Sequence, residues 1–354
     1  MRRKIFSAAS SITRWGTRVI VSVSLCLMLL IPIGLKVSAQ TSTDRFLVPL
    51  GNYHIAQWLF TPNYAESGII FILSHVQEKV ELQGIHRSDD RGETWSRASG
   101  NLKPEDRYRY YVIAVSPRFE INRTLWLFGS KPRTQTGGPR LGMWESKDGG
   151  ESWWRRGAAL PEVNSIVISP NISQDGIMLA SLTGYGIVIS HDIGASWETL
   201  SKIRDVSGVY APPSFPEEPF IAVATTGSKL KISTDGGRTF ETSAEGLPES
   251  MFAVRGVAFS QNFAQDRKMF CFGSAGIFVS DDAGIHWTPL VTPASGQDFT
   301  VMAVSGDFVH YGAIAYGTDD GEIYLSDDMG KTFHSIGAES LVNYPIETLA
   351  FPPD

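Results

Sequence analysis

Ser88-Asp89-Asp90-Arg91-Gly92-Glu93-Thr94-Trp95 is the first of six copies of the pattern Ser-x-Asp-x-Gly-x-x-(Trp/Phe), which we call the octapeptide turn. The later copies begin at Ser146, Ser190, Ser233, Ser280 and Ser326, so successive copies start 43 to 58 residues apart. A fixed period in this range indicates a repeat architecture, in which each period builds one supersecondary unit. The sequence therefore predicts an array of six similar units.

Each octapeptide turn lies between two runs of strand-forming residues, such as Gly186–Ser190 before the third copy and Trp197–Leu200 at its end. The pattern is typical of a hairpin turn, because a carboxylate accepts hydrogen bonds from nearby N–H groups and glycine readily adopts a positive φ. The aromatic residue anchors the next strand by burying a large apolar area. We therefore interpret the six aspartates as structural rather than catalytic: Asp90, Asp148, Asp192, Asp235, Asp282 and Asp328.

The six copies, which run in register from Ser88 to Phe333, resemble the Asp-box (BNR) repeat. That repeat occurs in sialidases, sortilin-type receptors, xyloglucanases and photosystem II assembly factors. The resemblance implies a β-propeller of the sialidase-like superfamily. It implies no single activity, because the repeat is a structural turn that enzymes and non-enzymes share.

Each period also contains short strand-like runs bounded by Gly, Pro, Asn and Asp, four per period, as in a propeller blade. We predict an all-β fold: a single propeller of six to seven four-stranded blades with Asp-box turns, over residues 45–354. One spare strand precedes the first blade at Arg45–Leu50, and another follows the last at Ile346–Phe351. Because propellers close by pairing their terminal strands, these two segments are candidates for ring closure. The sequence leaves the choice between six and seven blades open.

Residues 1–39 have the pattern of an export signal. Basic residues are followed by the apolar run Val19–Leu35, and Val37-Ser38-Ala39 offers small residues for cleavage. A retained membrane anchor is the alternative, since the run is near the short end of a spanning helix. We expect an exported, secreted or extracytoplasmic monomer that contacts membrane only through an uncleaved N-terminal segment. The net charge of −6 and the absence of a basic stripe argue against nucleic acid as a partner.

The strand order predicts two faces. If the first strand of a blade runs from top to bottom, the octapeptide turns lie at the bottom, and the fourth-to-first and second-to-third connections lie at the top. Two neighbouring top connections, residues 103–111 and 131–140, are rich in Arg and Tyr, which suit recognition of carboxylates, sulfates or acidic peptides. The candidate binding residues are Arg107, Tyr108, Arg109, Tyr110, Lys131, Arg133 and Arg140. A solvated loop is the alternative interpretation of this sector.

No sequence motif identifies a set of catalytic residues. The sialidases that resemble this repeat carry an Arg-Ile-Pro motif and three arginines that clamp the sugar carboxylate. This chain has no Arg-Ile-Pro, and no arginine follows Arg267. The seven histidines show no ligand spacing, so we predict no metal, no cofactor and no catalytic residue. We expect a non-enzymatic binding or assembly module for a protein or glycan ligand. The alternatives are a divergent glycoside hydrolase and kinship with photosystem II assembly factors, which would make the partner a membrane protein complex.

Overall fold

The structure is a computed structural model. It describes the backbone of residues 12–14 and 17–23, and otherwise residues 54–75, 84–102, 109–131, 140–157, 160–227, 230–251, 253–293, 297–305, 308, 312–336 and 345–353.

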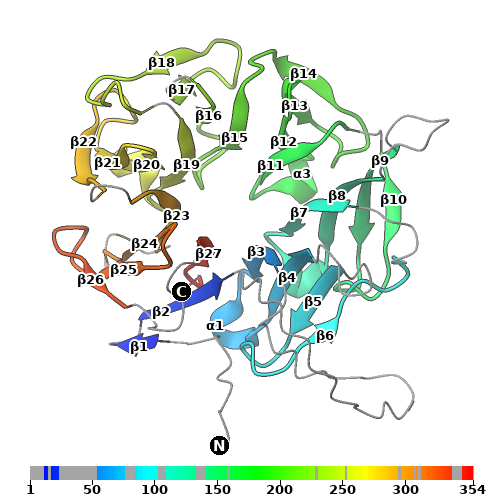
Figure 1. Ribbon diagram of the computed structural model, residues 1–354. Coiled ribbons are helices and arrows are strands. Elements are labelled where there is room, and N and C mark those ends of the chain that lie inside the picture. Colours follow the sequence, from blue (N-terminus) through cyan, green and yellow to red (C-terminus); the bar gives the residue numbers. More distant parts are fainter. Residues whose placement is uncertain are drawn as a thin grey trace, which may run out of the picture.

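Six four-stranded antiparallel sheets make up most of the described chain (Figure 1). Blade one comprises β3 (His54–Phe60), β4 (Ile70–His75), β5 (Gly84–Ser88) and β6 (Ser96–Arg97). Blade two comprises β7 (Arg109–Val115), β8 (Leu125–Lys131), β9 (Arg140–Ser146) and β10 (Trp154–Arg156). Blade three comprises β11 (Val163–Ile168), β12 (Met178–Leu182), β13 (Gly186–Ser190) and β14 (Glu198–Ser201). Blade four comprises β15 (Val206–Tyr210), β16 (Ile221–Thr225), β17 (Leu230–Ser233) and β18 (Glu241–Ser243). Blade five comprises β19 (Val254–Phe259), β20 (Met269–Gly273), β21 (Gly276–Ser280) and β22 (Thr288–Val291). Blade six comprises β23 (Phe299–Val304), β24 (Ile314–Thr318), β25 (Ile323–Ser326) and β26 (His334–Ser335). The predicted all-β propeller is confirmed.

A seventh, smaller sheet lies between blades six and one (Figure 1). It consists of β27 (Ile346–Ala350), β2 (Thr17–Val23) and β1 (Ile12–Arg14), in the order β1-β2-β27. Strand β27 contacts the innermost strands β23 and β3, just as the innermost strands of the other blades contact one another. The ring therefore has seven innermost strands, of which six belong to complete blades. The predicted C-terminal spare strand is β27, whereas Arg45–Leu50 lies outside the described residues.

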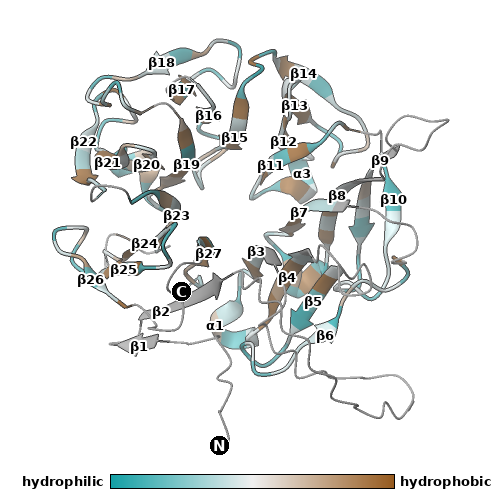
Figure 2. Cartoon of the chain, in the orientation of Figure 1, coloured by the Kyte–Doolittle hydropathy of each residue, from teal (hydrophilic) through white to brown (hydrophobic). Residues whose placement is uncertain are grey.

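The hydrophobic core is divided among the joints between blades. Apolar residues gather on the inner strands, and outermost strands such as β18 are largely hydrophilic (Figure 2). The joint between blades one and two is typical: Phe71 and Ile113 from the inner strands are fully buried beside Trp153 from the second octapeptide turn. Each turn aromatic thus belongs to a core cluster, as the sequence predicts for an anchoring residue.

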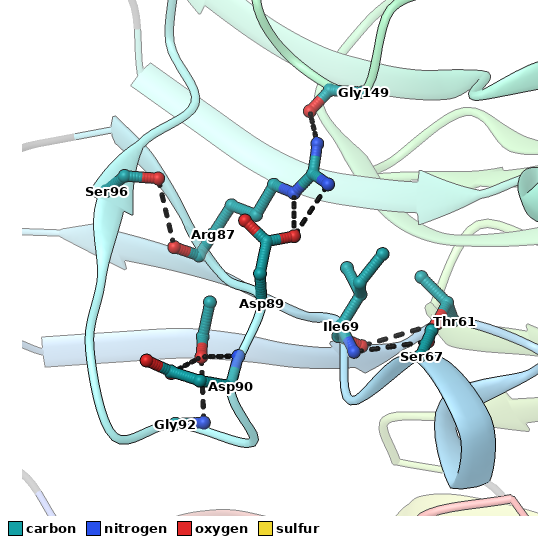
Figure 3. A network of polar contacts seen from close by, with 10 residues as sticks. Thr61, Ser67, Ile69, Arg87, Asp89, Asp90, Gly92, Ser96 and Gly149 are labelled. Carbon is teal, nitrogen blue, oxygen red and sulfur yellow. Dashed lines mark hydrogen bonds and ion pairs between the residues drawn. The ribbon is translucent and has the colours of Figure 1, made fainter. Parts of the chain in front are cut away.

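The six octapeptide turns share one hydrogen-bond pattern, except that in the fifth the His286 Nδ1 replaces the hydroxyl that contacts the aspartate Oδ2. In the third copy the Ser190 hydroxyl donates to Asp192 Oδ1 (2.8 Å) and accepts from the Gly194 N–H (2.8 Å). Asp192 Oδ1 also accepts from the Ser196 N–H (2.8 Å), and Oδ2 accepts from the Ser196 hydroxyl (2.6 Å). Figure 3 shows the first copy, in which Ser88 makes the corresponding bonds with Asp90 and Gly92. The aspartate satisfies the N–H groups of its own turn, which is a structural role.

The octapeptide turns pack on the connections between first and second strands. These connections contain the short helices α1 (Tyr64–Ser67), α2 (Phe119–Asn122), α3 (Ile172–Asp175) and α4 (Phe263–Asp266). In blade three, the Ile193 N–H donates to the carbonyl of Gly176, immediately after α3, at 2.9 Å. The residue after each aspartate has a left-handed backbone even where it is not glycine, as at Ile193 with φ 58°. The docking hydrogen bond offsets this strain, and the predicted bottom face is confirmed.

A β-bulge interrupts the innermost strand of each of the six blades, and also β27, at an equivalent position near the start of the strand. The bulged residues are Ala56, Tyr111, Asn164, Ser207, Arg255, Thr300 and Glu347. A bulge turns a side chain away from the sheet faces. Four of these side chains donate to a carbonyl of the next innermost strand: Asn164 to Val206 (3.0 Å), Ser207 to Val254 (3.1 Å), Thr300 to Ile346 (2.6 Å) and Arg255 to Phe299. The bulges therefore tie neighbouring blades together near the top face.

The contact between blades four and five is expected to depend on pH. His286 of the fifth octapeptide turn lies 2.6 Å from Asp282 and 3.4 Å from Glu245 of blade four. The hydrogen bond to Asp282, aided by the charge of Glu245, raises the pKa of His286 above its ordinary 6.5. A raised folded-state pKa contributes stability below about pH 6.5, and this contribution is lost as the pH rises through the raised pKa.

We therefore expect the denaturation midpoint of the wild-type chain to fall between about pH 6 and about pH 8, and to fall less in His286→Asn. The midpoints are measured by chemical denaturation at both pH values. Equal changes in the two proteins would show that His286 does not contribute.

Candidate binding surface

Three of the predicted binding residues lie at the same end of three adjacent strands. Arg109 at the start of β7 pairs with Ser130 near the end of β8. The next residue of β8, Lys131, pairs with Arg140 at the start of β9. Strand pairing places opposed residues within about 5.5 Å between Cα atoms. The backbone thus gathers Arg109, Lys131 and Arg140 at the top edge of blade two, opposite the octapeptide turn; we call this group the basic edge.

The remaining predicted residues divide into two groups. Arg107, Tyr108 and Arg133 lie outside the described residues. Tyr110 is 8 % exposed and packs edge-to-face on Trp144, with ring centroids 5.8 Å apart. Its ring is already engaged by the protein, so we omit Tyr110 from the proposed surface. The physical reason is the bulge at Tyr111. It places Tyr110 on the same side of β7 as Ile113, in the core cluster between blades one and two.

A second polar group on the top face was missed by sequence reasoning. Arg255 of blade five donates to Asp298 Oδ2 at 2.6 Å, at the entry to blade six. The Asp298 N–H donates to Asp319 Oδ1 (2.9 Å), and the Asp319 N–H returns a bond to the Asp298 carbonyl (3.0 Å). The group links the connection before β23 to the hairpin between β24 and β25. The sequence signal for this polar group is the acidic pair Asp319-Asp320, which looks like part of an ordinary turn.

An exposed aromatic residue on the top face was also missed. Tyr185 lies in the hairpin between β12 and β13 of blade three and is 65 % exposed. Blade three adjoins blade two through the contact of β11 with β7. Its sequence context, Thr183-Gly184-Tyr185-Gly186, is that of a tight turn, which explains why the residue did not stand out.

The turn aspartates are unsuited to acid catalysis. Hydrogen bonds from the Ser196 hydroxyl and N–H lower the pKa of Asp192 to about 2, and those from Thr332 lower the pKa of Asp328 to about 2. The N–H and hydroxyl of Thr239 likewise lower the pKa of Asp235. A general acid in glycoside hydrolysis needs the opposite shift, a raised pKa. These carboxylates therefore remain ionised, and they lie on the face opposite the basic edge.

Within the described part of the chain, no three His, Cys, Asp or Glu side chains gather in a way that could bind a metal ion. Over the same residues, no helix combines the length and the hydropathy needed to cross a membrane.

Solved structures with the same fold include both enzymes and binding proteins. The GH74 xyloglucanase from Xanthomonas campestris matches with a TM-score of 0.61 and 18% identity, over 82% of this chain and 46% of the xyloglucanase. YCF48 bound to a D1 peptide matches with a TM-score of 0.58 and 16% identity, over 84% of this chain and 97% of YCF48. The extracellular domain of BT4673 from B. thetaiotaomicron matches with a TM-score of 0.57 and 13% identity, over 81% of this chain and 33% of that one.

These similarities concern the fold. The chain spans less than half the length of the xyloglucanase, but nearly all of YCF48 can be superposed on it. No protein-family model matches the sequence, and no curated protein matches it. The chain is a β-propeller, similar in fold to hydrolases and to a peptide-binding protein.

Proposed function

We propose that the chain is an exported, non-enzymatic binding or assembly module of the sialidase-like Asp-box propellers, which binds an acidic protein segment or glycan through its top face. The observation that carries the proposal is the basic edge, where the strand register brings Arg109, Lys131 and Arg140 together in a protein of net charge −6. Arginine recognises carboxylates and sulfates through paired hydrogen bonds, and interface hot spots are enriched in arginine and tyrosine. Arg107, Tyr108 and Arg133 extend this surface in the proposal.

The likeness to YCF48 supports a protein ligand. The two chains have nearly the same extent, and YCF48 is described as bound to a D1 peptide. A peptide ligand for this chain would need acidic side chains or a terminal carboxylate to match the basic edge. If the chain shares the role of photosystem II assembly factors, its partner is a membrane protein complex, and the photosynthetic status of the host separates that role from others.

Removing the basic edge should weaken partner capture without unfolding the protein. We expect Arg109→Ala/Arg140→Ala to bind its partner about tenfold more weakly at low salt, and less so at high salt, because salt screens exposed charges. In the proposal these two charges face solvent and the ligand, so melting should be nearly unchanged, because exposed charges contribute little stability. The measurement is quantitative recovery of partners from the native envelope fraction at two salt concentrations.

The matched control is Lys202→Ala/Arg204→Ala, which removes two exposed charges from the top connection between β14 and β15. It should recover partners as the wild type does. Equal recovery by wild type and by Arg109→Ala/Arg140→Ala would mean that the basic edge is solvated and binds no partner.

A divergent glycoside hydrolase is the second candidate, favoured by the likeness to GH74 xyloglucanase. Hydrolysis needs two carboxylates about 5–10 Å apart around the sugar. On the top face the acidic residues of blade six, Asp298 and Asp319, are the described group to test. Turnover of sialosides or β-glucans by the purified chain, abolished in Asp298→Asn or Asp319→Asn, would replace the binding proposal.

A further inference from the structure

We propose that the outer edge of β27 is a strand-acceptor site, at which the exported chain binds an extended, β-branched segment of a partner protein. This inference rests on the proposed protein-binding function, but it concerns a surface remote in sequence from the basic edge. It begins from the composition of the seventh sheet. Among the described residues, the six complete blades have four strands each, whereas the seventh sheet has three, and its two outer strands both come from Ile12–Val23.

Strand β27 contacts both neighbouring blades as well as β2. Ile346 is fully buried and Leu349 is 6 % exposed, both in a cluster with side chains of blade six. The Thr300 hydroxyl of blade six donates to the Ile346 carbonyl at 2.6 Å. On the other side, Ala350 packs against the cluster of blade one that contains Trp58. Strand β27 is therefore anchored to blades six and one by contacts that do not involve β2.

The strand that covers this edge belongs to the predicted export segment. Strand β2 pairs Ile20 with Ala350 and Val21 with Leu349. The same residues begin the apolar run Val19–Leu35. Cleavage after Ala39 would remove β2, and retention as an anchor would draw Val19–Leu35 into the membrane. In either case export would withdraw β2 from β27 and leave its edge as a template for another strand, which we assign to a partner rather than to Arg45–Leu50 of this chain.

The strand now bound indicates which partner fits. Thr17–Val23 is an extended segment with valine or isoleucine at four of its seven positions, and it runs antiparallel to β27. Strand addition takes its affinity from main-chain hydrogen bonds and its specificity from pockets for alternate side chains. The side of blade one that packs against β27 also contains a buried hydrogen-bond donor. Trp58 is 7 % exposed, and its indole N–H has no acceptor among the described residues.

The test uses the exported chain isolated from the envelope fraction, with its N-terminus established by mass spectrometry. The probe is a labelled synthetic peptide with the sequence of residues 12–23, and the control is the same peptide with Ile20→Pro. We expect the first peptide to bind and to protect from hydrogen exchange those amides of Ile346–Ala350 that face it. The control should bind about tenfold more weakly, because proline is poorly tolerated within a paired strand.

Two results would overturn the proposal. If the peptide does not bind and the β27 amides are already protected, another part of this chain pairs with the outer edge of β27. If it does not bind and those amides exchange freely, the edge does not accept strands. The variant Arg109→Ala/Arg140→Ala should bind the peptide as the wild type does. If the wild type does not bind the peptide but still captures partners from the envelope fraction, the strand-acceptor site is rejected and the proposed function stands.

Discussion

Trp153→Ala is expected to lower the free energy of unfolding by about 3–5 kcal/mol, as large-to-small changes in cores do. Trp153 is the aromatic residue of the second octapeptide turn and is 2 % exposed. Its indole N–H donates to the Ala98 carbonyl of blade one at 3.0 Å. The substitution therefore leaves a cavity at the joint between blades one and two and an unpaired buried carbonyl.

Trp197→Ala is the matched control, because Trp197 has the same place in the third octapeptide turn. Its ring is only partly buried, so the expected loss is smaller, below about 3 kcal/mol. Chemical denaturation followed by circular dichroism measures both variants. If Trp153→Ala unfolds at the same denaturant concentration as the wild type but no longer captures its partner, the aromatic is a binding residue and the scaffold interpretation is wrong.

Gly246→Ala is expected to destabilise the chain by more than about 2 kcal/mol. Gly246 has φ 85°, which costs an alanine about 1–2 kcal/mol. An added Cβ would also overlap the Trp287 carbonyl, at the contact between blade four and the octapeptide turn of blade five. Because that obstacle is backbone, relief requires the two blades to separate, and overpacking of this kind costs about 1–3 kcal/mol more.

The control for Gly246 is Gly227, which has a similar φ of 80° but no atom within 4 Å of an added Cβ. Gly227→Ala should therefore show only the cost of the left-handed backbone, about 1–2 kcal/mol. Thermal and chemical denaturation of the two variants give the difference. Equal losses would mean that the blades do not approach as closely at Gly246 as described.

The sequence predicts the blades well because their determinants are local. The hydrogen bonds of the Asp192 turn involve residues within four positions of the aspartate, so the pattern Ser-x-Asp-x-Gly specifies the hairpin. Ring closure depends on pairing between the two ends of the chain. It could not be derived, because the repeats contain no information on whether β27 meets Thr17–Val23 or another segment.

The bulges show a signal that was present but not recognised. A bulge shifts the alternation of inward and outward residues by one. That shift is visible only when the repeats are aligned, as in Val206-Ser207-Gly208 and Val254-Arg255-Gly256. The same effect explains the position of Tyr110. It was predicted to face a ligand, but the bulge at Tyr111 leaves its ring in the core.

The candidate surface was predicted from connectivity, which fixes the face on which each loop lies. The sequence could place residues 103–111 and 131–140 on one face of blade two, and the strand register brings Arg109, Lys131 and Arg140 to one edge. The group around Arg255 and Asp298 could not be derived, because its members are 43 residues apart and meet only through the packing of blades five and six.

Cross-linking of the captured complex, followed by mass spectrometry, tests most directly whether the partner binds at the top of blade two. Lys131 lies at the basic edge, and Lys147, with a side chain 65% exposed, lies in the octapeptide turn on the opposite face of the same blade. Binding at the top face predicts cross-links from Lys131 to acidic segments of the partner, and none from Lys147. Cross-links confined to Lys147 and to Lys331 of the sixth octapeptide turn would contradict the proposed binding surface.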